Sequence, residues 1–234
     1  MQMSRPAMFA LDLLFPKRCV GCGTFGTFLC GPCADGMERA TGTPDRCPNC
    51  AGRWPKPLNC PRCAHWNALD GGRAAFEMAG PARRVVHALK YTGVRAIAPW
   101  MAESMGTLRD GLESALFLPV PLHRSRTRSR GFNQAEVLLA ELGWPRAEGE
   151  LTRHRQTRTQ VGLHLRERRA NVAGAFRFEG PRLDGQTVVL IDDVITTGAT
   201  ANECALVLKD HGARQVHVAA FARASHEGEH PASD

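Results

Sequence analysis

Cysteines form the first of two residue sets in this 234-residue chain whose types and spacing could do chemistry. Eight of the nine cysteines fall into Cys-x-x-Cys pairs, and all eight lie before residue 64. A Cys-x-x-Cys turn directs two thiolates toward one point, and two such turns complete the tetrahedral sulfur shell that zinc prefers. The pairs are Cys19/Cys22, Cys30/Cys33, Cys47/Cys50 and Cys60/Cys63.

These pairs predict two structural zinc ions. We expect sequential use of the pairs, with one ion on Cys19, Cys22, Cys30 and Cys33 and a second on Cys47, Cys50, Cys60 and Cys63, although the spacing also allows interleaved pairing. A disulfide framework or redox-active pairs are the competing interpretations. Closed four-thiolate sites leave no position for a substrate, so we expect a folding role, with docking of nucleic acid or protein as the functional alternative.

Two further residues, His65 and Cys204, are expected to have structural roles. His65 adjoins the last pair and is expected to be an additional exposed histidine rather than a ligand. Cys204 stands alone within an apolar helical stretch and is expected to be a small buried hydrophobe.

The second set is the segment Val188 to Thr200, which reads Val-Val-Leu-Ile-Asp-Asp-Val-Ile-Thr-Thr-Gly-Ala-Thr. Its apolar start predicts a buried parallel strand, and Asp192 and Asp193 mark the carboxyl end, where open α/β sheets bind ligands. The loop from Thr196 to Thr200 then opens a helix, whose first amides and dipole favour a phosphate. An ordinary strand and capped helix with two exposed carboxylates is the alternative.

Two residue types in this loop fit an anion. Thr196, Thr197 and Thr200 offer hydroxyl donors, and Gly198 is expected to let the backbone approach the anion closely. The chain contains no Gly-x-x-x-x-Gly-Lys-Ser/Thr run, so a P-loop nucleotidase is not supported.

An arginine-rich segment, residues 120–134, alternates arginines with small polar residues. In an extended loop these guanidinium groups share one face and converge on an anion, which suits a pyrophosphate because arginine binds phosphate oxygens in bidentate fashion. A second basic stretch runs from Arg153 to Arg169. The alternative is that both charge runs are solvated surface.

The elements that must position these residues are read from hydrophobic periodicity. We expect helices at 81–91, 97–110 and 133–143, and strands at 115–120, 175–178, 187–191 and 215–221. Strands that alternate with helices predict an α/β fold with a mostly parallel sheet covered on both faces. The Gly71-Gly72 pair marks a predicted domain boundary, which gives a cysteine module at 1–70, a second domain at 71–223 and a flexible tail at 224–234.

Charge and hydropathy limit the classes of partner. A formal net charge of +7 and a pI near 9.2 favour polyanions such as phosphorylated metabolites, nucleic acid or lipid headgroups. The apolar stretch Met8 to Phe15 is far shorter than the roughly 20 residues that span a bilayer. We therefore expect no transmembrane segment, no signal peptide and a cytoplasmic location.

The segment from Val188 to Thr200 resembles the signature of type I phosphoribosyltransferases at all these positions. In that family the loop binds the 5′-phosphate of phosphoribosyl pyrophosphate, and the acidic pair binds the ribose hydroxyls. The resemblance therefore implies a binding site made by Asp192, Asp193, Val194, Ile195, Thr196, Thr197, Gly198, Ala199 and Thr200.

Further motifs resemble the ComF/ComFC family, and the similarity runs from Leu11 to Arg223. They are Ala-Leu-Lys-Tyr-Thr-Gly at 88–93, Val-Pro-Leu-His at 120–123, Arg-Gly-Phe-Asn-Gln at 130–134, residues 160–171 and Gly-Ala-Phe at 174–176, together with the cysteine pairs. The family implies a zinc-ribbon module fused to a phosphoribosyltransferase-like domain, associated with DNA uptake and natural competence.

Roles follow from this resemblance residue by residue. Lys90 is expected near the mouth of the site, Arg128 and Arg130 facing the pyrophosphate, and Gln160 and Arg168 on a mobile cover. With Asp192 and Asp193, the residues Lys90, Arg128 and Arg130 form the predicted catalytic set.

Three activities remain open at this point. The first is transfer from a Mg²⁺-bound phosphoribosyl pyrophosphate to an unidentified acceptor, and the second is non-catalytic binding of single-stranded DNA through the same anion pocket. The third is a sensor that binds phosphoribosyl pyrophosphate without turnover. Other DNA-uptake proteins are the expected protein partners.

Overall fold

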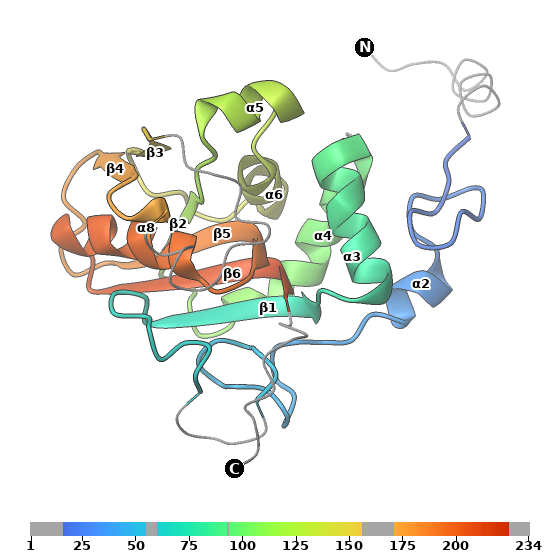
Figure 1. The fold of residues 1–234 in the computed structure, drawn as a ribbon, viewed down its shortest axis with the longest axis horizontal. Coiled ribbons are helices and arrows are strands. Elements are labelled where there is room, and N and C mark those ends of the chain that lie inside the picture. The colour runs from blue at the N-terminus through green and yellow to red at the C-terminus, as the bar shows by residue number, and fades with distance from the viewer. Residues whose placement is uncertain (1–15, 55–59, 93, 156–170, 225–234) are drawn as a thin grey trace.

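The computed structural model describes residues 16–54, 60–92, 94–155 and 171–224. Its centre is a four-stranded sheet in which all neighbouring strands run parallel (Figure 1). The strand order is β1 (Gly71–Glu77), β6 (Gln215–Arg223), β5 (Thr187–Ile195) and β2 (Leu116–Pro119). The predicted α/β class with a parallel sheet and flanking helices is confirmed.

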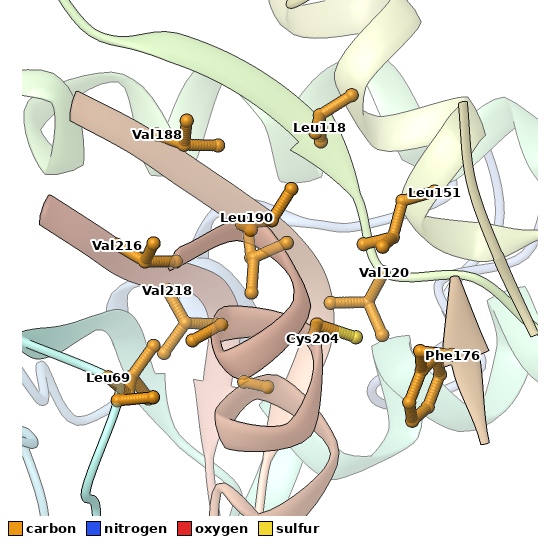
Figure 2. Packing of buried hydrophobic residues seen from close by; sticks show 14 of the residues in the cluster. Leu69, Leu118, Val120, Leu151, Phe176, Val188, Leu190, Cys204, Val216 and Val218 are labelled. Atoms are coloured by element: carbon orange, nitrogen blue, oxygen red, sulfur yellow. The ribbon is translucent and has the colours of Figure 1, made fainter. Parts of the chain in front are cut away.

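Alternate residues of β5 enter two separate cores, because successive side chains in a strand point to opposite faces. Val188 and Leu190 pack on the face covered by α8 (Ala199–Asp210), where Cys204 is fully buried as predicted (Figure 2). Val189 and Ile191 pack on the other face. That second face is covered by α3 (Gly80–His87), α4 (Ala98–Met105) and α6 (Gln134–Leu142).

The expected helices all occur, with local changes at their ends. Helix α3 continues as a π-helical turn over Ala88–Thr92, so the expected helix at 81–91 changes its pitch before its end. The expected helix at 97–110 is α4 with a short 3₁₀ segment on each side, at Arg95–Ile97 and Gly106–Arg109. Helix α6 matches the expected 133–143.

Two of the expected strands are longer than predicted, and two strands were missed. Strands β5 and β6 continue to Ile195 and Arg223, so Asp192 and Asp193 lie within β5 rather than beyond it. The missed strands are β1 and β3 (Glu150–Arg153), the latter paired antiparallel with β4 (Phe176–Glu179). The sequence of β1 carries no β-branched residue, and only its pairing with other segments makes it a strand.

The arginine-rich segment is a helix, α5 (Arg124–Arg130), and the expected extended loop is wrong. His123 caps the helix start, accepting a hydrogen bond from the Ser125 amide at 3.2 Å. Gly131 ends it in the left-handed conformation, with φ +80°. These two caps, rather than apolar periodicity, define the helix, because no residue of α5 is buried.

The cysteine-rich segment packs along the outer edge of β1. Backbone hydrogen bonds join Ala40 to Ala75 and Thr41 to Ala74, each 3.1 Å long, and join the Gly72 amide to Asn49 at 2.7 Å. The Gly71-Gly72 pair is therefore the buried start of β1, and the division of the chain at residues 70/71 stays a prediction. A side chain at Gly72 would collide with Trp66, whose ring atom lies 2.9 Å from the Cβ position.

Among the residues that the structure describes, no helix is both long and apolar enough to cross a bilayer.

Candidate functional site

The eight paired cysteines form two separate sulfur quartets. Within each quartet all four sulfur atoms lie within 4.8 Å of one another, and the quartets are Cys19, Cys22, Cys30 and Cys33, and Cys47, Cys50, Cys60 and Cys63. The sequential grouping is therefore confirmed over the interleaved one. None of the nine cysteines forms a disulfide.

The sulfur spacing fits zinc. The closest contacts are 3.5 Å and 3.6 Å in the first quartet and 3.8 Å in the second. A tetrahedral ion with Zn–S bonds of about 2.3 Å requires sulfur atoms about 3.8 Å apart. Both quartets are closed four-thiolate sets, so structural zinc is the ion that they fit.

A cavity of about 780 Å³ opens where β5 ends and α8 begins. It is lined by Asp192, Asp193 and most of the loop 196–200, which is called the phosphate loop below, and by residues of α5, of the start of α6 and of the π-helical turn. This position, at the carboxyl ends of parallel strands, is where open α/β sheets bind ligands.

The loop residues 196–200 divide between the cavity and the interior. Thr196, Gly198, Ala199 and Thr200 line the cavity, together with Val194 and Ile195. Helix α8 has no acidic residue in its first turn, so its amide groups and dipole favour an anion at this end. Thr197 is buried instead, and its hydroxyl accepts a hydrogen bond from the Ala199 amide at 3.3 Å.

Gly198 is required for a reason that the sequence did not reveal. Its φ of +79° is a backbone conformation that favours glycine. A Cβ atom there would lie 2.5 Å from the indole nitrogen of Trp66. The missing side chain therefore makes room for a tryptophan that follows the second cysteine quartet, in addition to permitting the turn.

Lys90, which was expected near the mouth of the site, lies beside the acidic pair. Its Nζ is 3.0 Å from Oδ2 of Asp193, and both side chains are largely buried. The π-helical turn Ala88–Thr92 positions this lysine, and such turns within helices are frequent at functional sites. The ion pair leaves Asp192 as the carboxylate without a lysine partner in the described residues.

Asp192 has a raised pKa. Removal of its carboxyl group from solvent is the largest cause, the charge of Asp193 adds to it and Lys90 opposes both, and together these effects raise the pKa of Asp192 to about 8. Asp192 nevertheless keeps part of its surface on the cavity, and its Oδ1 accepts the Asp193 amide at 2.8 Å. The direction follows from two carboxyl groups that share one partly enclosed site.

Arginines from α5 and β3 form one wall of the cavity. Arg126 and Arg130 line it, one helical turn apart, together with Arg153 from β3. Burial is the largest cause and the positive charge of Arg126 the second, and together they lower the pKa of Arg153 to about 10. Cations held this close to one another repel, so an anion in the cavity relieves the repulsion.

Arg128 does not line the cavity, in contrast to its expected place beside Arg130. It lies two residues from both Arg126 and Arg130, which is about 200° around a helix. Arg124 and Arg128 are exposed on the outer side of α5. The sequence reasoning missed Arg126 because it assumed an extended loop, although the His123 and Gly131 caps were a signal for a helix.

The Arg-Gly-Phe-Asn-Gln motif mainly builds the wall. Asn133 caps α6 by accepting the Ala135 amide at 3.1 Å, and its side-chain amide donates to the Val120 carbonyl at 3.0 Å. Arg130 donates to the buried Gln134 at 3.2 Å. The motif thus fixes the start of α6 and joins it to the end of α5, the helix that carries Arg126 and Arg130.

Tyr91, the single tyrosine of the chain, stands at the cavity and is 60% exposed. Its ring contacts His87, with centroids 4.7 Å apart, and the guanidinium of Arg130 lies 5.2 Å from its centroid. Sequence reasoning did not assign Tyr91 a role. The expected cover residues Gln160 and Arg168 lie outside the described residues.

Comparison with known proteins assigns the two parts of the chain. A family model described as "Phosphoribosyl transferase domain" matches residues 129–234, and one described as "Double zinc ribbon domain" matches residues 10–64. A hypoxanthine phosphoribosyltransferase from Staphylococcus aureus aligns at 10% identity over 59% of this chain and 72% of its own, with a TM-score of 0.35. That structural likeness is too low to carry an argument.

Curated relatives extend over most of the chain. "DNA utilization protein YhgH" of Salmonella typhimurium is 34% identical over 81% of this chain and 88% of its own length. "Competence protein ComFC" of Streptococcus pneumoniae is 27% identical over 83% and 87%, and "Competence protein F" of Haemophilus influenzae is 38% identical over 46% and 49%. With its double zinc ribbon and its phosphoribosyltransferase-type domain, this chain belongs to the ComF/ComFC family.

Proposed function

We propose that this chain binds phosphoribosyl pyrophosphate, or a related ribose phosphate, with Mg²⁺ and that this binding serves DNA uptake. The observation that carries the proposal is a single cavity that joins a helix start, two carboxylates and an arginine wall. The names of the relatives, which refer to DNA utilization and competence, support the link to DNA.

Each part of the ligand has a matching part of the cavity. The first amides of α8 and the hydroxyls of Thr196 and Thr200 would bind the 5′-phosphate. Asp192 and Asp193 would accept hydrogen bonds from the ribose hydroxyls. Arg130 keeps its expected role beside the pyrophosphate, and Arg126 takes the role expected of Arg128, because the segment is a helix.

Mg²⁺ fits the residues present. It takes oxygen ligands and is usually held by one or two carboxylates together with substrate phosphates. Asp193 is already paired with Lys90, so Asp192 is the carboxylate that would contribute to the ion. When bound, Mg²⁺ would neutralise charge on the pyrophosphate.

The proposed reaction is transfer at the anomeric carbon. The bond from that carbon to the pyrophosphate oxygen breaks, and its electron pair leaves with the pyrophosphate. A lone pair of the acceptor forms the new bond to the same carbon. Arg126, Arg130 and Lys90 would stabilise the leaving group, and the carboxylates would stabilise positive charge that develops on the ribose.

Calorimetric titration of the full chain with ribose 5-phosphate, and with phosphoribosyl pyrophosphate plus Mg²⁺, tests this proposal. We expect both ligands to bind and pyrophosphate to be released when the acceptor is supplied. Binding of phosphoribosyl pyrophosphate without release of pyrophosphate, whichever acceptor is added, would favour a sensor over a transferase. Failure of the wild-type chain to bind either ligand would contradict the proposal.

The raised pKa of Asp192 predicts how the titration depends on pH. Below a pH of about 8 this carboxyl group is protonated and cannot contribute its charge to Mg²⁺. The affinity for Mg²⁺–phosphoribosyl pyrophosphate should therefore increase as the pH rises from 6 to 9. Asp192→Asn should weaken binding and abolish that increase, whereas an unchanged pH profile in this variant would remove Asp192 from the site.

A second candidate function is binding of single-stranded DNA, favoured by the exposed pair Arg124 and Arg128. This pair is matched by Arg126 and Arg130 on the cavity side of the same helix. Alanine at Arg124 and Arg128 should reduce the slope of log K for DNA binding against the logarithm of the salt concentration by roughly 0.7 per arginine. Ribose 5-phosphate binding should be unchanged.

Alanine at Arg126 and Arg130 provides the matched control. It should weaken ribose phosphate binding and leave the salt dependence of DNA binding closer to that of the wild type. Equal losses of DNA binding in both pairs would place DNA in the cavity itself.

We also propose a cytoplasmic location, because thiolate zinc ligands are maintained in a reducing compartment.

A further inference from the structure

The phosphate loop contacts the segment that follows the second cysteine quartet. The indole nitrogen of Trp66 donates to the Thr197 carbonyl at 2.9 Å, and Nε2 of His65 lies 3.0 Å from the same oxygen. These residues come two and three positions after Cys63. The Trp66 ring also occupies the space that a side chain at Gly198 would need. The apex of the loop, Thr197 and Gly198, therefore packs against His65 and Trp66.

A buried arginine joins the start of the loop to the same quartet. Arg223, at the end of β6, is 1% exposed and donates to the carbonyls of Ile195, at 3.0 Å, and of Thr196. Its other terminal nitrogen lies 3.9 Å from Sγ of Cys50, which is fully buried. Four thiolates around Zn²⁺ carry a net charge of about −2, which offsets the buried guanidinium.

The first turn of α8 is tied to the module as well. Oδ1 of Asn202 accepts hydrogen bonds from the amides of Asn67, Ala68 and Leu69 at 3.0 to 3.3 Å. Its side-chain amide donates to Oδ1 of Asn67 at 2.7 Å. The start, apex and helical end of the phosphate loop are thus each held by residues adjacent to one quartet.

The first quartet has a different environment. It lies beside Val20, Phe28 and Leu29, which pack against the core under α3 and α4. In the described part of the chain, no hydrogen bond found joins this quartet or its neighbours to the phosphate loop. The two quartets have the same ligands, so the first is a matched control for the second.

From these contacts we infer that the second quartet positions the phosphate loop, so that zinc at Cys47, Cys50, Cys60 and Cys63 sets the affinity of the cavity for ribose phosphate. Trp66 and Arg223 are the positioning residues. This inference rests on the proposed function and adds a regulation to it. Because coupling between binding sites is reciprocal, bound ribose phosphate should also make the second quartet retain its zinc more tightly.

The test compares Cys60→Ser/Cys63→Ser with Cys30→Ser/Cys33→Ser in the full chain. Zinc content, thermal unfolding, ribose 5-phosphate affinity and hydrogen exchange of residues 195–202 are measured for both. We expect each variant to lose one zinc. The second-quartet variant should lose at least tenfold in ribose 5-phosphate affinity, which corresponds to about 1.4 kcal/mol, and its amides at 195–202 should exchange faster. The affinity of the first-quartet variant should stay within about twofold of that of the wild type.

Cysteine substitutions can unfold the protein, so a second test uses variants that keep all the zinc ligands. Trp66→Phe retains a ring but loses the donor to Thr197, and it should weaken ribose 5-phosphate binding by about 2- to 13-fold, the range for one hydrogen bond. Trp144→Phe, at a ring that contacts Phe117 instead, is the control and should bind as wild type. Equal affinities in Trp66→Phe and wild type would overturn the role of Trp66.

Chelator challenge supplies the reciprocal measurement. Ribose 5-phosphate should slow zinc loss from Cys30→Ser/Cys33→Ser, which keeps only the second quartet, and should not slow it in Cys60→Ser/Cys63→Ser. If the wild type binds ribose 5-phosphate and both variants bind and exchange alike, the inference is wrong while the proposed function stands. If the wild type binds nothing, the proposed function fails, and unchanged exchange at 195–202 would overturn the positioning role as well.

Discussion

The two cysteine quartets share their ligands and their Cys-x-x-Cys spacing, but they differ in what surrounds them. In the first quartet Cys22 is exposed, and Arg18 stacks on the exposed ring of Phe25 nearby. In the second quartet Cys47, Cys50 and Cys60 are buried, and Arg223 links Cys50 to the phosphate loop. Identical metal chemistry is therefore peripheral in one place and adjacent to the candidate site in the other.

Under our inference, a closed zinc site affects ligand binding without contacting the ligand. A four-thiolate ion has no open coordination position, so any influence must pass through the residues packed against it. The second quartet has such residues next to the loop, whereas the residues beside the first quartet pack against the core under α3 and α4, on the face of the sheet opposite α8. Three predictions, two of them with a matched control variant, test whether this contrast holds.

The largest effect is expected at Glu77, which pairs with Arg46 just before the second quartet. Both side chains are buried, and Arg46 also contacts the half-exposed Glu38 at 2.6 Å. Glu77→Gln should lower the free energy of unfolding by about 3 kcal/mol, because it leaves a buried guanidinium with a weaker partner. Urea denaturation measures this change, and zinc loss from the second quartet should accelerate.

Glu179→Gln is the control for Glu77→Gln. Glu179 is 68% exposed and lies 3.7 Å from the exposed Arg177, so its loss should cost below about 1 kcal/mol. Similar costs for the two variants would mean that the buried pair does not anchor the second quartet to β1.

The next effect compares Gly198→Ala with Gly23→Ala. Gly23 follows Cys22 of the first quartet, and the two glycines have similar φ angles, +79° for Gly198 and +83° for Gly23. Of the two, only Gly198 has another residue close to the position that a Cβ atom would take. Backbone strain alone should cost each variant about 1–2 kcal/mol. Gly198→Ala must also displace Trp66, so it should additionally lose ribose 5-phosphate affinity, measured by calorimetry, whereas Gly23→Ala should keep it. Equal affinities would break the contrast.

The smallest effect is expected at Arg18. Its guanidinium lies 4.0 Å from the centroid of the Phe25 ring, which is 58% exposed. Arg18→Ala should lower stability by about 0.5–1 kcal/mol, the range for exposed cation–π pairs, as a small shift in thermal unfolding. Hydrogen exchange at residues 195–202 should not change, and faster exchange there would show that the first quartet also reaches the phosphate loop.

The sequence predicted the parts of this fold that depend on local pattern. The four consecutive apolar residues that open β5 and the turn chemistry of the phosphate loop specify a strand and a helix start by themselves. The Cys-x-x-Cys pairs likewise predicted two quartets, which the sulfur positions confirm. These features are readable because neighbouring residues determine them.

The errors occurred where distant residues determine the structure. Strand β1 has no β-branched residue and exists because β6 and the segment around residues 38–49 pair with its two edges. The extended loop expected for the arginines was wrong because its caps, His123 and Gly131, outweigh the lack of apolar periodicity in α5. As a result Arg126, rather than Arg128, shares the cavity with Arg130.

The sequence by itself determined which groups this protein has available: two sets of four cysteines, a strand-to-helix turn rich in threonine and glycine, and two adjacent carboxylates. Only the tertiary structure decided which quartet lies against that turn, because spacing along the chain fixes the geometry within a motif but not its neighbours. Residues 66 and 197 are 131 positions apart, and burial of the Trp66 ring against Gly198 brings them together. That contact is a property of packing, which no local pattern encodes.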